Sequence, residues 1–341
     1  MHSSTSNSRE PLINSRSWGW TWLLVIIIWA GILVPYELWL REQGHRSSVE
    51  SNQDLWSWYR GQADQQSNPL VLVGASRMQL GLDTATIREM LPQRPLIELS
   101  INGQYPMATL RGLAEDEAFS GLVIVSITAQ SLEPVYWDMQ LPENVYYAEK
   151  ATLYRSLDAY LTAWLQSKFS FLSPQLGLQQ IIESYQNQHL FPQPFYVRGN
   201  LDLSKSGDYS KQDTGALVNH FVSEKEQNYQ QQPPMSLAVF EQQIDQLNQY
   251  IKAIQARGGQ VILLRMPTDQ GHWKLDEQYY PYEQYWQRLE RVSLAPTIHF
   301  RQIPGLDQFK LPDSTHLDQT DAPEFTRILF DYLSKQNLLT D

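Results

Sequence analysis

The segment Leu-Val-Leu-Val-Gly-Ala-Ser-Arg at residues 70–77 decides the fold class. Its first four residues are an unbroken apolar run, which is typical of a strand buried on both faces. Gly74 ends this run, and Ser76 follows two residues later. Strands buried on both faces occur mainly in parallel sheets covered by helices, whose ligands bind beyond the carboxyl ends of the strands. The segment therefore predicts a buried parallel strand whose carboxyl end lies at the ligand-binding edge of the sheet.

The same alternation of strand and helix continues along the chain. Apolar runs that predict further strands lie at residues 96–101, 122–127, 261–264 and 297–300. Between them, Asp83 is expected to cap a short helix, and residues 107–114 have helical apolar spacing. Strands that alternate with helices indicate a parallel sheet covered on both faces.

Two helices near the C-terminus have the clearest patterns. Apolar residues between Phe240 and Ile254 are spaced 4-3-4-3, and Gly258 follows as a stop signal. A last helix is expected to begin at Asp321, with Glu324 completing a capping box.

The N-terminal region contains a candidate membrane span. Residues 17–36 carry no charge, and about 20 apolar residues suffice to cross a hydrocarbon core of about 30 Å. Aromatic rings stand at both ends, as membrane interfaces favour; these are Trp18, Trp20, Trp22, Tyr36 and Trp39. The alternative is a cleaved signal peptide, but the run is long for one and no A-x-A-like site follows it.

These features predict a division of the chain. We expect a cytoplasmic tail at 1–16, a signal anchor at 17–40, a stalk or a short helix leading to the domain at 41–68, and an α/β domain at 69–336. Residues 132–235 interrupt the alternation and are interpreted as an insertion, helical near 148–168 and 174–188, with a loop in the Gln-rich patch at 227–232. We expect this insertion to shape the substrate groove.

Charge and composition limit the partners. The chain has 26 basic and 37 acidic residues, a net charge of −11, and no basic stripe. Phosphate backbones are bound by clustered Lys and Arg, so a nucleic-acid partner is not expected. The absence of cysteine excludes disulfides, thiolate metal sites and cysteine nucleophiles. We expect no cofactor and no metal.

Reactive side chains follow the predicted strands. A serine becomes a nucleophile when a base takes its proton, and that base works best when a carboxylate orients it. Asp313 and His316 are three residues apart, so one turn can bring the carboxylate to one ring nitrogen and leave the other for Ser76. The backbone N–H groups of Ser76 and Gly103 are candidates to stabilise an oxyanion.

Here the chain resembles the SGNH (GDSL-like) hydrolase superfamily over residues 70–130 and 236–336. Gly-Ala-Ser-Arg at 74–77 looks like the first block of that superfamily, Gly103 matches the second-block glycine, and Asp-Ser-Thr-His-Leu at 313–317 matches the terminal D-x-x-H block. The resemblance implies a three-layer α/β/α, flavodoxin-like domain with Ser76, His316 and Asp313 as catalytic residues. The combination with a membrane span is similar to bacterial members found beside envelope-polysaccharide acylation systems, and a membrane-bound O-acyltransferase is the partner this implies.

The third block departs from the superfamily pattern. The pattern is G-x-N-D, whose Asn donates to the oxyanion, whereas residues 128–131 read Thr-Ala-Gln-Ser. Gln130 offers an equivalent amide on a longer arm and is the candidate third donor. Losing one such donor typically lowers the rate by about 10²–10³-fold, which weakens an enzyme without abolishing it.

Further polar residues at strand ends are candidates for binding substrate: Arg77, Asn102 and Arg265. Arg77 can instead form a structural ion pair. Asp269 and His272 are expected on a mobile rim loop.

The sequence favours a serine esterase or O-acyltransferase acting on acyl esters of an envelope carbohydrate, held on the outer face of the cytoplasmic membrane. The basic residues flanking the span are tied, so this orientation rests on the exported character of the superfamily. Two alternatives remain: a non-catalytic scaffold that binds a glycan or envelope partner, and a lipid esterase at the bilayer surface.

Overall fold

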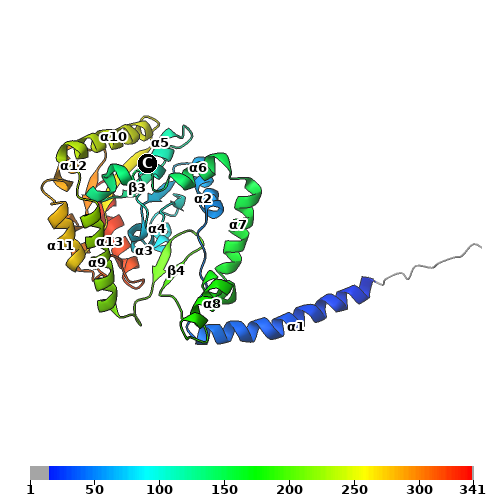
Figure 1. Cartoon of the computed structure of the whole chain (residues 1–341). Coiled ribbons are helices and arrows are strands. Elements are labelled where there is room, and N and C mark those ends of the chain that lie inside the picture. Colours follow the sequence, from blue (N-terminus) through cyan, green and yellow to red (C-terminus); the bar gives the residue numbers. More distant parts are fainter. Residues whose placement is uncertain (1–14, 340–341) are drawn as a thin grey trace, which may run out of the picture.

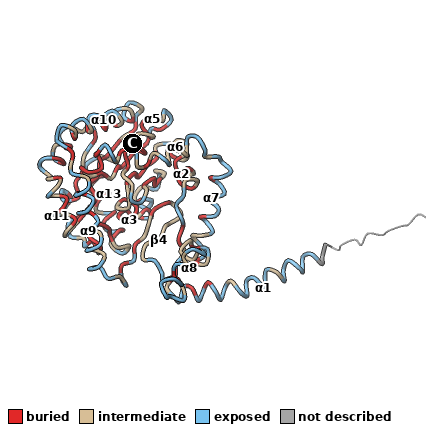
Figure 2. The backbone as a smooth tube through the Cα atoms, viewed as in Figure 1, coloured by how far each residue is buried: buried red, intermediate tan, exposed pale blue. Residues whose placement is uncertain are grey.

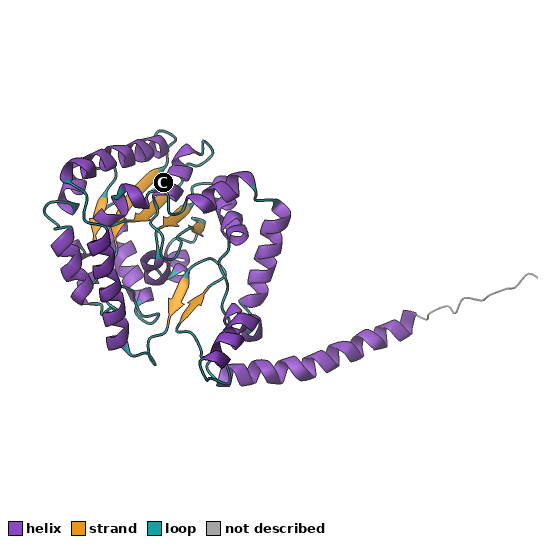
Figure 3. Cartoon of the chain, viewed as in Figure 1, coloured by secondary structure: helices purple, strands orange, loops and turns teal. Residues whose placement is uncertain are grey.

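A computed structural model describes residues 15–339 of the chain; the expected cytoplasmic tail lies almost entirely outside them. Its centre is a five-stranded sheet in the order β2-β1-β3-β6-β7, with every neighbouring pair parallel (Figure 3). The strands are β1 (Leu70–Val73), β2 (Leu96–Glu98), β3 (Leu122–Ser126), β6 (Gln260–Arg265) and β7 (Thr297–His299). The predicted flavodoxin-like α/β/α class is confirmed.

Helices cover both faces of the sheet because successive strand residues point to opposite sides. Val71, Val123 and Val261 pack on one face beneath α2 (Gln53–Gln65), α5 (Met107–Glu115), α10 (Leu237–Gln255) and α12 (Trp286–Val292). Leu72, Ile124 and Ile262 pack on the other, beneath α3 (Ser76–Gly81), α4 (Thr84–Met90) and α13 (Ala322–Lys335). The sheet is thus buried on both sides, as its continuous apolar runs require.

The predicted helix before β6 is present as α10. Ser236 caps it by accepting the N–H of Val239 at 3.3 Å, and the five apolar residues from Phe240 to Ile254 are all buried. Gly258, at φ +84°, ends the helical course in a conformation that favours glycine. At the start of α4, Asp83 accepts the N–H of Thr86 at 2.7 Å, which confirms the predicted cap.

The capping box predicted for the last helix is wrong, although α13 begins where it was expected. Asp321 has helical backbone angles, φ −93° and ψ −28°, and makes no side-chain cap bond. The carbonyl of Asp318 instead accepts the N–H groups of Asp321 and Ala322. Glu324, expected to reach back to the cap, contacts Arg327 at 3.4 Å.

Of the two structures expected for residues 41–68, the short helix is present as α2, whereas the stalk is wrong. Helix α2 forms part of the domain, with the side chains of Leu55 and Trp56 fully buried against the sheet. The Trp56 indole donates to the carbonyl of Leu99 at 3.1 Å, and the Val49 N–H donates to Gly199 at 2.9 Å. The segment looks polar in sequence because several of its buried residues, such as Ser57 and Arg60, are themselves polar.

The residues between β3 and α10 wrap around the side of the domain. They contain α6 (Leu141–Glu149), α7 (Leu153–Gln166), α8 (Leu178–Gln186), a hairpin of β4 (Val197–Gly199) and β5 (Lys205–Gly207), and α9 (Thr214–Gln231). Helix α7 packs on α2, and α9 packs on α11 (Gln270–Tyr279). The Gln-rich patch expected as a loop is instead the end of α9, where Tyr229 is buried.

One helix in the described part of the chain, α1 (Ser15–Glu42), is long and apolar enough to cross a membrane. It projects away from the domain, and its surface between Trp18 and Tyr36 is almost wholly exposed (Figures 1 and 2). Only its C-terminal end is held by the domain. Leu40 is buried there, and the Glu37 carboxylate accepts the N–H groups of Ser170 at 3.0 Å and Phe171 at 3.1 Å.

A buried acid at the end of β2 predicts a pH-dependent stability. Burial raises the pKa of Glu98 to about 8, even though its carboxyl accepts the Ser100 N–H at 2.7 Å. The folded state therefore binds a proton that the unfolded chain releases near its ordinary pKa of 4.5. This stability is fully present below pH 4.5 and is lost as pH rises through about 8.

In the wild-type protein the free energy of unfolding should decrease between pH 5 and pH 9. We expect Glu98→Gln to make this decrease smaller by about 2–4 kcal/mol, since one pKa unit corresponds to about 1.4 kcal/mol. Urea titrations at several pH values measure it, with the exposed Glu115→Gln as control. Equal slopes in wild type and Glu98→Gln would contradict it.

Candidate active site

Ser76 lies beyond the carboxyl end of β1 as the first residue of α3. The preceding turn needs Gly74, because a Cβ there would come within 2.8 Å of the Met78 Cβ and 3.0 Å of the Ser126 Cβ. A larger residue would push α3 away from the sheet. The turn thus places the Ser76 hydroxyl at the carboxyl edge of the sheet, where an α/β domain binds ligands.

The loop after β7 brings the other two predicted catalytic residues to Ser76. His316 Nε2 lies 2.8 Å from Ser76 Oγ, and His316 Nδ1 lies 2.8 Å from Asp313 Oδ2. Both distances are those of good hydrogen bonds. The structure therefore connects a hydroxyl, an imidazole and a carboxylate in series, which is the geometry that activates a serine nucleophile.

Asp313 is completely buried, and each of its oxygens has two hydrogen-bond donors. Oδ1 accepts the N–H groups of Thr315 at 3.0 Å and His316 at 2.8 Å. Oδ2 accepts the hydroxyl of Tyr209 at 2.8 Å in addition to His316. Burial alone would raise the pKa of Asp313, but the bonds from His316, Tyr209 and Thr315 hold it below its usual range. The carboxylate stays ionised and holds the imidazole in one orientation.

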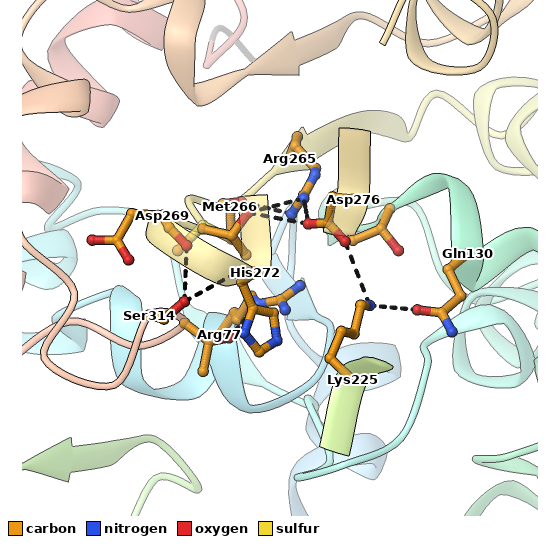
Figure 4. A network of polar contacts seen from close by, with 12 residues as sticks. Arg77, Gln130, Lys225, Arg265, Met266, Asp269, His272, Asp276 and Ser314 are labelled. Carbon is orange, nitrogen blue, oxygen red and sulfur yellow. Dashed lines mark hydrogen bonds and ion pairs between the residues drawn. The ribbon is translucent and has the colours of Figure 1, made fainter. Parts of the chain in front are cut away.

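Asp269 and His272 were expected on a mobile rim loop, and this is wrong. They support the Asp-x-x-His loop at Ser314, whose φ of +74° is unusual for a residue with a side chain. Ser314 Oγ donates to the Asp269 carbonyl at 2.8 Å, and the His272 N–H donates to Ser314 Oγ at 3.3 Å. Figure 4 shows this junction beside the polar network of the site. The contacts hold the loop in the conformation that aims His316 at Ser76.

The expected oxyanion donors all line one cavity with Ser76. Within residues 15–339, the N–H groups of Ser76 and Gly103 donate to no carbonyl, so both are available. Gly103 has φ +72°, and no heavy atom outside the adjoining residues lies within 4 Å of the place where a Cβ would stand. Gln130 Oε1 accepts the Tyr105 hydroxyl at 2.8 Å and Lys225 Nζ at 2.5 Å. Its amide is the part left to donate, and its role as third donor stays a prediction.

The three candidates for substrate binding are separated by the structure. Arg77 lines the cavity, where its Nε donates to Thr315 Oγ1 at 2.7 Å. Asn102 lines a different cavity, together with Ser48 and Asn200. Arg265 is buried and tied to Asp276 at 2.5 Å, outside the lining (Figure 4). The structure thus gives no support to Asn102 or Arg265, because Asn102 lines another cavity and Arg265 is neutralised by Asp276.

The cavity, of about 380 Å³, is closed on one side by α9. Phe221 packs edge-on against the His316 ring at 5.8 Å between centroids, and Lys225 reaches the Gln130 amide. Both α9 and Tyr209 belong to the 132–235 insertion, which was expected to shape the substrate groove, but neither was singled out from the sequence. They are distant from the catalytic motifs along the chain, and no local spacing marks them.

Comparisons with known proteins gave few matches. No family model matches this chain, and no curated protein does. Two solved structures show low similarity. TesA has 12% sequence identity to this chain and a TM-score of 0.35. The psychrotrophic esterase EstA from Pseudoalteromonas sp., in a structure inhibited by monoethylphosphonate, has 13% sequence identity and a TM-score of 0.35. The matches cover 79% and 80% of this chain and 99% of each of those chains.

Proposed function

We propose that this protein is a membrane-anchored, extracytoplasmic serine esterase or O-acyltransferase of SGNH type, acting on acyl esters, foremost acetyl esters, of an envelope carbohydrate. The observation that carries the catalytic part is the series of two 2.8 Å contacts from Ser76 through His316 to Asp313. The substrate class rests on the resemblance to envelope-polysaccharide acylation proteins, as does the membrane-bound O-acyltransferase proposed as partner.

The first half of the reaction forms an acyl-enzyme. Ser76 Oγ attacks the ester carbonyl while His316 Nε2 takes its proton, and Asp313 stabilises the imidazolium. The negative charge on the former carbonyl oxygen is met by the N–H groups of Ser76 and Gly103. As the ester C–O bond breaks, His316 returns the proton to the leaving alkoxide.

The second half releases the acyl group to water or to a sugar hydroxyl. The attacking O–H gives its proton to His316 as its oxygen bonds to the acyl carbon, and Ser76 leaves with that proton. Of the two, we favour transfer, because α9 closes one side of the cavity, the anchor keeps the domain near a membrane acyl supply, and a weak oxyanion hole would slow wasteful hydrolysis. Which acceptor wins depends on whether the pocket favours the sugar over water.

An acyl-transfer assay tests this direction. The full chain is given an activated acetyl donor with and without an oligosaccharide, and the sugar is analysed by mass spectrometry. We expect acetylated sugar with wild type and none with Ser76→Ala. Deacetylation of a pre-acetylated glycan, with no transfer from any donor, would show that hydrolysis is the reaction.

A fluorophosphonate probe tests whether the site is catalytic at all. We expect labelling of wild type on Ser76 and none of His316→Ala, because the probe needs an activated serine. If the protein neither reacts with the probe nor hydrolyses acetyl esters, the non-catalytic scaffold would become the favoured function. Turnover of lipid esters but not of acetylated sugars would favour a lipid esterase.

The topology is tested by reporter fusions. We expect an alkaline phosphatase fused to the C-terminus to be active, since the domain is proposed to lie outside the cytoplasmic membrane. A reporter that works only in the cytoplasm should be silent at the same position. The opposite pair of results would place the domain inside.

A further inference from the structure

The cavity beside Ser76 contains a cation with no charge partner. Within the described residues, the Arg77 guanidinium has no carboxylate at ion-pair distance, and only its Nε is used, by Thr315. Asp276, an acid whose charge acts on Arg77, is already held by Arg265 at 2.5 Å and Lys225 at 3.5 Å. Glu224, at the rim, is exposed and directed to His220. The remaining guanidinium N–H groups of Arg77 are therefore free to bind a ligand.

Two further groups converge on the same place, as Figure 4 shows for Arg77, His272 and Lys225. His272 is 5% exposed, and its Nδ1 is buried without a hydrogen-bond partner. Burial and the neighbouring cations Arg77 and Lys225 lower the pKa of His272 to about 3, so the ring is neutral and one ring nitrogen carries a hydrogen. An unpartnered buried polar atom costs free energy unless something binds it.

We propose that Arg77, His272 and Lys225 form a subsite for an anionic oxygen group, a carboxylate or a phosphate, that the acyl substrate carries close to its ester. This subsite specifies the substrate of the proposed function more closely. The claim that the bound molecule is a substrate rests on that proposed function. All three residues line the same cavity as Ser76 and His316, so a bound anion would sit beside the reacting carbonyl. Guanidinium and ammonium donors bind such groups by charge-assisted hydrogen bonds.

Matched esters test the subsite in the full chain. The rates of 3-acetoxybenzoate and 3-acetoxyphenyl phosphate are compared with that of the neutral 3-acetoxybenzamide. We expect wild type to prefer one anionic ester by about 10- to 100-fold in kcat/KM, the range of a hydrogen bond to a charged group. Arg77→Gln should lose most of that preference, while Arg327→Gln, a surface arginine on α13, should keep it. The anionic ester with the higher kcat/KM shows whether the subsite binds a carboxylate or a phosphate.

A binding measurement keeps the result independent of turnover. Calorimetry with Ser76→Ala measures benzoate, inorganic phosphate and neutral benzamide. Anion binding that the added Arg77→Gln abolishes would support the subsite even if no ester is hydrolysed, in which case the proposed function alone fails. Ester turnover without anion preference, together with no anion binding, would overturn the subsite and leave the function standing.

A second inference comes from an unrelated surface, the outer faces of α7 and α8. On α7 the exposed apolar residues fall on one face of the helix: Leu153, Tyr154, Leu157, Leu161, Trp164 and Leu165. The opposite side of α7 packs on the domain, where Tyr160 stacks on Trp58 and Ala163 is buried. On α8 the exposed apolar residues share a face as well: Leu178, Ile181, Ile182 and Tyr185. Contiguous exposed apolar surface of this kind marks an interaction site.

The position of α1 indicates what covers this surface. Helix α1 leaves the domain beside the 3-10 turn Ser170–Leu172 that follows α7, and Glu37 and Arg41 bond to that region. Trp39 packs on Phe191, just after α8, at 5.3 Å between ring centroids. Figure 1 shows α7 along the edge of the domain on the side toward which α1 extends. A bilayer crossed by α1 would therefore face α7 and α8.

We infer that the outer faces of α7 and α8 lie in the interface of the lipid bilayer that α1 spans. An amphipathic helix with Trp, Tyr and Leu on one face is suited to that position. The domain would then be laid against the membrane surface at two places and not only tethered by one helix.

The cysteine-free chain allows a direct test with single labels. A Leu161→Cys variant of the full chain carries an environment-sensitive fluorophore and is placed in nanodiscs with nitroxide-labelled lipid. We expect a blue shift and strong quenching at Leu161 and at Tyr185→Cys, but neither at Gln249→Cys, an exposed position on α10. Equal quenching at Leu161 and Gln249 would overturn the inference. A blue shift at Leu161 without lipid quenching would overturn it too, because a second copy or another protein would then cover the face.

Discussion

Replacing Ser76 with alanine in the full-length chain is expected to lower the hydrolysis of small acetyl esters by about 10³-fold or more, because members of a catalytic triad act as a unit. The lost hydroxyl is the nucleophile itself and sits 2.8 Å from His316 Nε2. No other described serine pairs with this imidazole, so no neighbour can take over the attack. Initial rates over a range of substrate concentrations measure the loss in kcat.

His316→Ala should lose a similar factor, and the double variant should lose little more than either single one, because the two residues perform one step. Ser131→Ala is the matched control, since Ser131 is buried near the site but bonds only within its own turn at Thr128. Independent, additive losses in the double variant would contradict a shared role. A Ser76→Ala enzyme with near-normal kcat would refute Ser76 as nucleophile.

Replacing Asp313 with asparagine is expected to lower kcat by about 10³–10⁴-fold while the fold is retained. The backbone N–H groups of Thr315 and His316 should keep the amide oxygen in the place of Oδ1. The amide nitrogen would then face His316 Nδ1 and donate to it. That bond favours the tautomer with hydrogen on Nε2, which cannot take the Ser76 proton.

Tyr209→Phe separates tautomer control from simple positioning. It removes one of the four hydrogen bonds to Asp313 without changing the charge. We expect a smaller loss than for Asp313→Asn, about 10- to 100-fold in kcat, the range of one hydrogen bond to a charged group. Circular dichroism and thermal unfolding of both variants check the fold. Asp313→Asn with kcat within a few-fold of wild type would show that this carboxylate only supports the loop.

The strands and the main helices were predictable from local pattern because their signals are short-range. The buried strand at 70–73 shows itself as an unbroken apolar run, and α10 as apolar residues on one helical face. The contact between Asp313 and His316 is also local, since three residues span a single turn. In each case the interacting residues are close in sequence, so the local sequence pattern is enough to predict their arrangement.

Polar-looking segments were harder to interpret. Residues 41–68 were expected to form a stalk or a short helix leading to the domain, yet α2 lies in the core, because a few buried side chains are enough to attach an amphipathic helix. The Asp321–Glu324 motif matched a capping box, but the backbone angles at Asp321 prevented the cap. A sequence motif shows that a contact is possible, and the backbone conformation in the folded protein determines whether the contact forms.

The functional surroundings of the triad were settled only by tertiary structure. Tyr209 bonds to Asp313 across 104 residues, and Lys225 to Gln130 across 95. The same packing excluded Asn102 and Arg265 from the cavity and left Arg77 facing it without a carboxylate. By itself the sequence determined which residues could react and which strands would hold them. The folded chain decided which side chains meet at the site, because that depends on the packing of segments far apart in sequence.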